Sequence, residues 1–473
     1  MDDASALSQR IAGRELSCVE LMRSTLERIE RVNPALNAIV SLRDGEALLA
    51  EAAERDAELA RGERRGWMHG LPHAIKDLEE TAGIVTTFGS PLHAGFVPDT
   101  DSELVRRIRA AGAIVIGKTN VPEFGYGSQT YNEVFGATRN PYDTTRTAGG
   151  SSGGAAAALA AGLVPVADGS DYLGSLRNPA AFCNVSGFRP SLGRVGSPPP
   201  ESAFEAPMGT TGPMARTPRD LAALLATLAG PHAALPFSID DDPAALAAPL
   251  EPPDPARLRI GWLGDLGGHL PFEPGILELC EAALGRLGAE VVPVAPGFDP
   301  EEAWEATTTL RHYDATWLLD LPPERLKPEL RWEAEGAGAV TGPALYAAQR
   351  TRTAVAAALR ALLEQHDALA LPSAQVFPFD VTTTWPREVA GRPMPTYHRW
   401  MEVMTYPSLA GLPVAGVPAG FGPAGLPTGM QLIGRPRGDR ALLELVEAYD
   451  RATGWARTRP PTLNREQEVS SGS

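Results

Sequence analysis

Apolar residues near the N-terminus recur at helical spacing. Ser17 and Glu20 form the S-x-x-E pattern of a capping box at the start of one helix. Behind this box, four apolar residues at spacings of three, four and three line one helical face: Val19, Met22, Leu26 and Ile29. Residues 45–61 are mostly Ala, Glu and Leu, which predicts a second helix. Residues 1–65 are therefore expected to be helical and to carry no catalytic group.

Further along the chain, short apolar runs bounded by Gly or Pro alternate with helical stretches. The runs predict buried strands at 73–77, 113–120, 163–171, 258–265, 290–296, 367–373, 414–420 and 429–434. The helical stretches lie at 102–112, 151–162, 274–287 and 440–453. Alternation of this kind is typical of a sheet covered by helices on both faces. We expect an α/β fold, a single large α/β/α domain with a central mixed, twisted β-sheet.

The pattern contains no repeat of fixed period and no linker long enough to divide the chain. A single domain is therefore predicted over residues 1–473. We expect N-terminal helices at 1–65, a core at 66–230 and a loop at 231–255. A variable insert on the substrate side is expected at 302–400, and the chain is expected to return to the core at 401–460.

Composition and charge narrow the function. Hydrophobic residues make up 43% and charged residues 21%, the balance of a globular protein. No apolar run approaches the roughly 20 residues of a membrane helix, and the acidic start is unlike a secretory signal, so we expect a cytoplasmic protein without membrane contact. The formal charge of -16 argues against nucleic-acid binding, which needs clustered Lys and Arg.

The three cysteines, Cys18, Cys183 and Cys280, are too few and too scattered for a disulfide framework or a zinc site. We therefore expect a reduced compartment, no metal and no other cofactor.

The most unusual stretch is AGGSSGG, residues 148–154, which runs directly into an Ala-rich helix. Taken alone, such a string is equally consistent with a flexible linker. Its position between a strand-like region and a strong helix former favours a tight turn with exposed N–H groups, suited to an anion or oxyanion. The spacing fits neither a Walker loop nor a dinucleotide fingerprint.

Two further stretches contain candidate catalytic groups. Ser175 lies on a Gly-containing turn just after a predicted strand, where a hydroxyl can face a pocket, although an ordinary capping serine is the simpler interpretation. Lys76 ends another apolar run. Most lysines are solvated, but burial at a strand end would lower the pKa of the amine toward that of a usable base. A serine with a neutral lysine is a known alternative to a serine–histidine pair.

Together and in this order, these stretches resemble the amidase signature family. The matching segments are HGLPHAIKD at 69–77, GKTNVPEFGYGS at 117–128, TAGGSSGGAAAALAAG at 147–162 and GSLRNPAAFCNVSG at 174–187. A weaker match, AGLPVAGVPAGFGPAGLPTGMQLIGRP, follows at 410–436. The combination is far more specific than any one segment.

The resemblance implies a catalytic triad. It makes Ser175 the nucleophile, Ser151 a proton-relaying serine after a cis peptide bond, and neutral Lys76 the base, with Ser152 supporting Lys76. It also implies an oxyanion hole made of the backbone N–H groups of Tyr172, Leu173, Gly174 and Ser175.

One position departs from the family pattern. Leu173 stands where the family usually has glycine. The N–H is retained, so a hole can still form, but leucine disfavours positive φ and adds apolar bulk beside the scissile bond. Tyr126 and Leu173 are expected in the substrate pocket. Phe124 and Tyr131 are further candidates, and ordinary core packing is the alternative for each aromatic residue.

Three functions follow from the resemblance. The first is a stand-alone amidase that cleaves small apolar or aryl amides, with side activity on esters or carbamates, as a monomer or homodimer. The second is the glutaminase subunit of a tRNA-dependent amidotransferase, which would need partner proteins and which the residues around Ser175 fit poorly. The third is a non-catalytic binding protein on the same scaffold.

Overall fold

The computed structural model describes residues 2–196, 203–205, 208–461 and 463. Within these residues, eight strands form one sheet in the order β10-β9-β11-β15-β14-β7-β8-β6. The strand β9 pairs in parallel with β10 and β11, and the remaining pairs are antiparallel. The predicted mixed sheet is therefore confirmed. Its strands are β6 (Ala167–Asp171), β7 (Ser186–Arg189), β8 (Thr210–Ala215), β9 (Arg259–Trp262), β10 (Glu290–Pro293), β11 (Ala368–Pro372), β14 (Val414–Phe421) and β15 (Pro427–Ile433).

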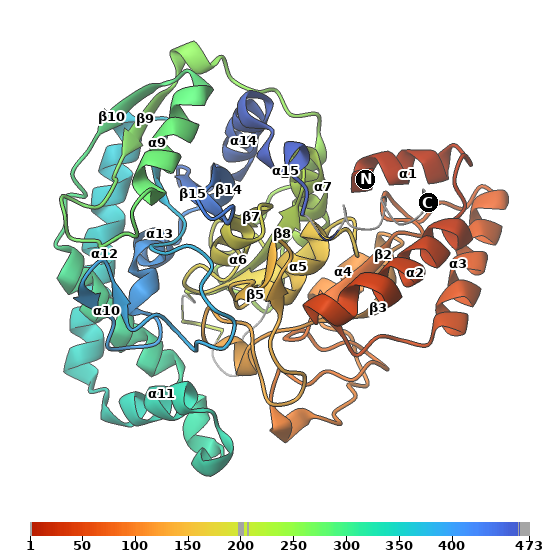
Figure 1. The fold of residues 1–473 in the computed structure, drawn as a ribbon, viewed down its shortest axis with the longest axis horizontal. Helices are drawn as coiled ribbons and strands as arrows, with labels where there is room; N and C mark the ends of the chain where they lie inside the picture. Colours follow the sequence, from red (N-terminus) through yellow and green to blue (C-terminus); the bar gives the residue numbers. More distant parts are fainter. Residues whose placement is uncertain (1, 197–202, 206–207, 462, 464–473) are drawn as a thin grey trace.

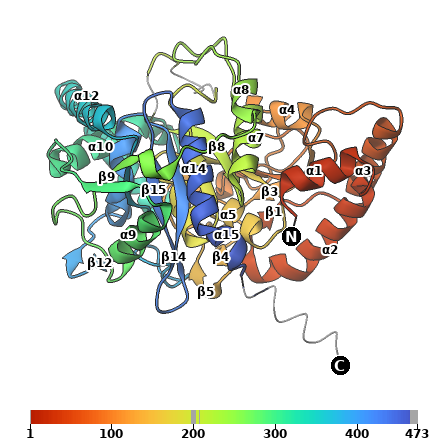
Figure 2. The same cartoon turned by 90° about the horizontal axis from the view of Figure 1, so that it is seen from above.

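Helices cover both faces of this sheet (Figures 1 and 2). One layer contains α7 (Pro218–Leu228), α9 (Ile276–Leu287) and α14 (Asp439–Thr453), which pack against one another and against the strands. The short helix α6 (Arg177–Phe182) packs on β14 and β15, and all its residues are buried. A Cβ at Gly416 of β14 would lie 2.9 Å from the Cα of Arg177. The glycine therefore allows α6, which follows the turn of the candidate nucleophile at 172–175 (the nucleophile turn), to approach the sheet closely.

A second, smaller sheet carries Lys76. It contains β1 (Ile39–Val40), β3 (Ile114–Thr119) and β2 (Pro72–Lys76), in that order. The sequence pattern predicts one continuous strand series, whereas β2 and β3 pair with each other and not with the large sheet. Asp168 of β6 joins the two sheets, because its carboxylate accepts the main-chain N–H of Lys76 at 3.1 Å and contacts His73 Nε2 at 2.9 Å. Lys76 is thereby held beside the end of β6.

The N-terminal segment folds as predicted into helices α1 (Ala4–Ala12), α2 (Cys18–Leu36) and α3 (Gly45–Ala60). The capping box is present, since Ser17 accepts from the N–H of Glu20 and Glu20 accepts from that of Ser17. The helix α4 (Glu103–Ala110) and the core helix α5 (Gly153–Ala160) also follow the predicted pattern. Among the described residues, no helix combines the length and the apolar character that crossing a membrane requires.

The predicted loop and insert need two corrections. The loop at 231–255 contains one helical turn, α8 (Ala244–Ala247). The insert predicted at 302–400 contains β11, which pairs with β9 and β15 in the core sheet because its ALALP run is wholly apolar. The segment before β11 forms α10 (Pro300–Asp314), α11 (Pro328–Ala339) and α12 (Gly342–Gln365). These helices and α1–α3 lie at opposite ends of the molecule, with the core between them (Figure 1).

The remaining described strands and α-helices are short. They are the hairpins β4 (Arg139–Asn140) with β5 (Asp143–Thr147) and β12 (Glu388–Val389) with β13 (Arg392–Pro393), and the helices α13 (Thr405–Leu409) and α15 (Trp455–Thr458).

Candidate active site

The Lys76 side chain is buried at the end of β2, with 1% of its surface exposed. Its Nζ lies 2.9 Å from Ser151 Oγ, 2.8 Å from Ser152 Oγ and 2.9 Å from Ser170 Oγ. Burial lowers the pKa of Lys76 to about 7, although the carboxylates of Asp168 and Asp171 favour the charged form. A large fraction of this amine is therefore uncharged at neutral pH.

The three hydroxyl groups match the hydrogen-bonding capacity of a neutral amine, which offers two N–H donors and one lone pair. Ser152 Oγ lies 3.3 Å from the carbonyl oxygen of Ser170, to which it can donate, and so it can accept from Lys76. If Nζ donates to Ser152 and Ser170, its lone pair is left for the hydroxyl of Ser151. This is the arrangement that proton transfer from Ser151 to Lys76 requires.

Ser151 and Ser152 lie at the N-terminal end of α5. The peptide bond between Gly150 and Ser151 is cis, as the family resemblance implies. The N–H of Gly150 donates to Asn178 Oδ1 at 3.2 Å, and the N–H of Ser152 donates to the carbonyl oxygen of Ser175 at 3.1 Å. The Gly/Ser turn and the nucleophile turn are therefore bonded directly to each other.

The turn around Ser175 depends on a glycine at position 174. Gly174 has φ +98°, and a Cβ there would lie 2.5 Å from Met404 Cγ. Leu173 is not among the residues with positive φ in the described chain, and its side chain is buried in the core. The leucine that departs from the family pattern is thus accommodated without the backbone conformation that leucine disfavours.

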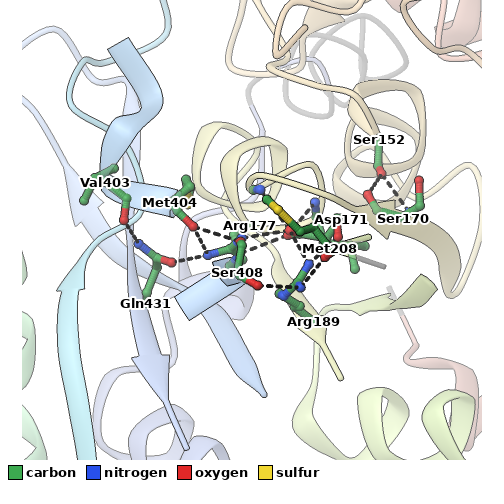
Figure 3. Close-up of polar contacts among 12 residues, drawn as sticks. Ser152, Ser170, Asp171, Arg177, Arg189, Met208, Val403, Met404, Ser408 and Gln431 are labelled. Carbon is green, nitrogen blue, oxygen red and sulfur yellow. Dashed lines mark hydrogen bonds and ion pairs between the residues drawn. The ribbon is translucent and has the colours of Figure 1, made fainter. Parts of the chain in front are cut away.

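A buried ionic network fixes the same turn (Figure 3). Asp171 binds Arg177 Nε at 2.9 Å and Nη2 at 2.8 Å, and it binds Arg189 Nη1 at 3.2 Å. Burial by itself would raise the pKa of Asp171, but the two guanidinium groups hold that pKa well below its usual range. The carboxylate therefore stays ionised. It also accepts the N–H groups of Gly174 at 2.8 Å and Leu176 at 3.1 Å.

Arg177 extends this network into the C-terminal part of the chain. Its Nη1 donates to the carbonyl oxygen of Met404 at 3.1 Å and to Gln431 Oε1, and its Nη2 donates to Ser408 Oγ at 2.7 Å. Figure 3 shows Arg177 between Gln431 on β15 and Asp171 beside the nucleophile turn. The weak C-terminal sequence match thus contributes to holding the turn.

The hydroxyl of Ser175 makes no hydrogen bond to any described residue, and 9% of the residue is exposed. The relay contact that the resemblance implies, from Ser175 Oγ to Ser151 Oγ, is therefore not made in this structure. Catalytic hydrogen bonds are often long in unliganded enzymes and tighten only when substrate binds. A relay through these serines would need Ser175 Oγ within hydrogen-bond distance of Ser151 Oγ.

The four predicted oxyanion donors are not equivalent. The N–H of Gly174 is taken by Asp171, as described above, and cannot also bind an oxyanion in this geometry. The N–H groups of Tyr172, Leu173 and Ser175 have no acceptor among the described residues. The prediction is therefore wrong for Gly174, and the other three N–H groups remain candidate donors.

The aromatic candidates differ in their surroundings. A Cβ at Gly125 would lie 3.6 Å from Ser151 Oγ, so the loop between Phe124 and Tyr126 passes next to this serine. Phe124 instead packs edge-on against Trp317, with ring centroids 5.0 Å apart. Tyr131 donates to Glu329 Oε1 at 2.7 Å. Gly125 thus brings this loop close to Ser151, and the side chains of both its neighbours, Phe124 and Tyr126, pack against one apolar cluster from residues 315–334.

A cavity of about 360 Å³ opens beside the candidate site. Its wall includes Ser170, which contacts Lys76, and Tyr172 of the nucleophile turn. Apolar side chains such as Leu192, Val195 and Phe237 form another part of the wall. The cavity therefore approaches Lys76 from the side of Ser170.

One trio of potential metal ligands, His269, Glu301 and Glu402, lies together in the described chain. Arg399 forms ion pairs with Glu301 at 2.6 Å and with Glu402 at 3.1 Å, and His269 Nε2 lies 2.7 Å from Glu402 Oε1. Both carboxylates of the trio thus already have Arg399 as a cationic partner in this structure.

Comparison with known proteins defines the class. A statistical model of the amidase family matches residues 20–443. The chain belongs to this family, and it is an enzyme that hydrolyses amide bonds.

Relatives within the family carry different names. The chain is 35% identical to a glutamyl-tRNA(Gln) amidotransferase subunit of Picosynechococcus sp., over 97% of this chain and 100% of that protein. It is 33% identical to an acylamidase of Rhodococcus erythropolis, over 97% and 96% of the two chains. Its fold is similar to that of a bacterial aryl acylamidase of the amidase signature family, with a TM-score of 0.87, 28% identity and coverage of 100% and 99%.

Several residues at the site were missed by sequence reasoning. Ser170 and Asp171 end the predicted strand at 163–171, just before the motif that contains Ser175, and this position could have drawn attention to them. Asn178 also lies in a motif, but its bond to Gly150 depends on the turn geometry. Arg311 and Lys327, which contact Tyr126, lie in the variable segment and leave no recognisable signal in the sequence.

Proposed function

We propose that this chain is a stand-alone amidase that cleaves small apolar or aryl amides through a covalent acyl-enzyme on Ser175. The observation that carries the proposal is the buried Lys76 amine, which lies 2.9 Å from Ser151 Oγ. A base with a pKa of about 7 is matched to proton transfer at neutral pH.

In the proposed mechanism, the amide enters with its carbonyl carbon next to Ser175 Oγ. Ser175 passes its proton to Ser151, and Ser151 passes its own proton to the lone pair of Lys76. Ser175 Oγ then bonds to the carbonyl carbon. Collapse of the tetrahedral intermediate breaks the C–N bond while Ser151 returns a proton to the leaving amine. A water molecule, activated by the same relay, then releases the acid and regenerates Ser175.

The negative charge of the tetrahedral intermediate needs donors that are already in place. The N–H groups of Tyr172, Leu173 and Ser175 are proposed for this role. Asp171 supports the role indirectly, because it holds the turn through Gly174 and Leu176.

An apolar or aryl acyl group is favoured by the residues near the turn. Tyr126 and Tyr172 provide rings near the turn, and Leu192, Val195 and Phe237 line the cavity beside it. The guanidinium of Arg311, which lies over both rings, is already paired with Glu333 at 2.5 Å. The names of the two acylamidase relatives agree with this substrate class.

The glutaminase subunit of a tRNA-dependent amidotransferase remains the alternative function, supported by 35% identity to one such protein. A subunit of this kind would work with partner proteins. Esters and carbamates, whose carbonyl groups the same nucleophile can attack, are proposed as secondary substrates.

The test is to purify the chain alone and to assay it on anilides, primary amides, carbamates, esters and glutamine. We expect hydrolysis of hydrophobic anilides and labelling of Ser175 by a fluorophosphonate, both abolished in Ser175→Ala. Glutamine hydrolysis that appears only with added partner proteins, without anilide hydrolysis, would favour the amidotransferase function. Absence of labelling in a folded wild-type protein would favour a non-catalytic scaffold.

A further inference from the structure

The guanidinium of Arg311, on α10, is surrounded by aromatic rings. Its Cζ lies 4.5 Å from the ring centre of Tyr126, 5.2 Å from that of Tyr172 and 5.6 Å from that of Tyr397. Contacts of this length between a cation and a ring face are attractive, more so where water is excluded. Arg311 is 8% exposed. One buried cation therefore connects two tyrosines from different parts of the candidate site.

Each of these two tyrosines belongs to a segment that reaches a proposed catalytic serine. Tyr126 directly follows Gly125, whose Cβ position lies 3.6 Å from Ser151 Oγ. Tyr172 is one of the proposed oxyanion donors and lies three residues before Ser175. The hydroxyl of Tyr172 also donates to Asp314, one helical turn after Arg311. Both contacts to Tyr172 thus come from the end of α10.

Arg311 is itself held rigidly. Its Nε donates to Glu333 Oε1 at 2.5 Å, and its Nε and Nη2 donate to the hydroxyl of Tyr397 at 2.9 and 2.6 Å. The planar guanidinium makes these bonds in its plane while the rings lie against it, which a lysine ammonium cannot reproduce. A shift of Glu333 or Tyr397 would therefore be transmitted to both rings.

A second basic side chain from the same segment holds Tyr126. Lys327 Nζ donates to the carbonyl oxygen of Tyr126 at 2.5 Å, and the main-chain N–H of Lys327 donates to Glu123 Oε2 at 3.0 Å. The ring and the carbonyl group of Tyr126 are thus fixed from two points of the variable segment.

We propose that Arg311 is a positioning residue for amide hydrolysis. It aligns the nucleophile turn with the loop beside Ser151 by holding Tyr172 and Tyr126 on one guanidinium. The inference rests on the proposed function, because it assigns Arg311 a role in that reaction. Under this proposal the variable insert at 302–400 also contributes to catalysis, because a residue outside the family motifs aligns the proposed catalytic serines.

The test compares three variants on a hydrophobic anilide, with active sites counted by fluorophosphonate labelling. Arg311→Lys keeps the charge but loses the planar contacts, and we expect kcat to fall about 10- to 100-fold while KM changes little, as for a small misplacement of catalytic groups. Tyr397→Phe removes the hydroxyl that accepts from Arg311 but keeps the ring, and it should lower kcat by a smaller factor. The labelling rate of Ser175 should fall in the same order.

Arg399→Lys is the third variant and the matched control. Arg399 also lies over a ring, 4.7 Å from the centre of Trp304, and also pairs with a glutamate, Glu301. Its described contacts include no residue of the catalytic motifs, so kcat should stay within about twofold of the wild type, as for a site remote from the chemistry.

The outcomes separate the inference from the proposed function. If Arg311→Lys keeps the wild-type kcat per labelled site, even with a lowered melting temperature, then Arg311 has only a structural role. This result would overturn the inference and leave the proposed function standing. A wild-type protein that is neither labelled nor active on any amide would overturn the proposed function. An equal loss of kcat in Arg311→Lys and Arg399→Lys would also reject the inference.

Discussion

At the scale of single residues, the environment of Lys76 explains how an amine can serve as a base without a histidine. Burial disfavours the ammonium form, and three serine hydroxyls replace the water that the amine loses. Asp168 and Asp171 limit the shift, so that the pKa stops at about 7. A pKa near the working pH lets the amine both accept and return a proton.

If the relay acts as a unit, its members should not contribute independently. We expect Lys76→Ala and Ser151→Ala each to lower kcat by roughly 10³-fold or more, and the double variant to be little worse than the less active single variant. Steady-state kinetics on one anilide, with circular dichroism to confirm folding, measures this. Losses that multiply in the double variant would mean that the two residues act separately.

Sequence reasoning identified Lys76, Ser151, Ser152 and Ser175 as candidates, and the fold brings Lys76 into contact with both Ser151 and Ser152. It included Gly174 among the oxyanion donors because a motif does not reveal which N–H groups a nearby carboxylate occupies. It gave no indication of Arg311, since a cation between aromatic rings arises only when distant segments pack together.

At the scale of secondary-structure elements, the nucleophile turn is held between β6 and α6. Asp171 at the end of β6 accepts N–H groups from the turn, and Arg177 at the start of α6 binds the same carboxylate. Gly416 lets α6 lie directly on β14. The turn is thus anchored at both ends, and its geometry is set before substrate binds.

Gly174→Ala tests this anchoring. The substitution adds a Cβ 2.5 Å from Met404 Cγ at a residue with φ +98°. The added strain should distort the turn, and we expect kcat/KM to fall about 100-fold or more, the scale of losing an oxyanion donor.

The control is Gly391→Ala, at φ +83° with no atom near the added Cβ. An alanine at position 391 has a similar free-energy cost for its positive φ, of about 1 kcal/mol, but its Cβ does not clash with another residue. Anilide kinetics and thermal melts of both variants separate the two effects. Equal activity in Gly174→Ala and Gly391→Ala would show that the turn tolerates displacement.

At the scale of the whole molecule, the alternating pattern predicted the class of fold and most of its strands. Periodicity did not reveal that β2 and β3 form their own sheet, because pairing partners are chosen by contacts distant in sequence. The apolar run at β11 was recognised as a strand, yet the surrounding region was predicted as one insert. The chain before β11 thus leaves the sheet and rejoins it at β11 without a change in amino-acid composition that would mark the boundary.

This arrangement assigns different tasks to the two ends of the molecule. The helices α2 and α3 contact the sheet that carries Lys76, while α10 and the chain leading into α11 contact Tyr126 and Tyr172. The Lys76 amine and the rings of Tyr126 and Tyr172 are therefore supported from opposite ends of the molecule.

The most direct test of the central claim is the pH dependence of Ser175 labelling by a small fluorophosphonate. Below the pKa of Lys76 the amine is protonated and cannot accept a proton, so the labelling rate of the wild type should fall about tenfold per pH unit and level off above a midpoint of about 7. Lys76→Ala should label far more slowly and show no such midpoint. A wild-type rate that stays flat down to about pH 5, well below any plausible pKa for a working lysine base, or equal rates in the two proteins, would contradict the account.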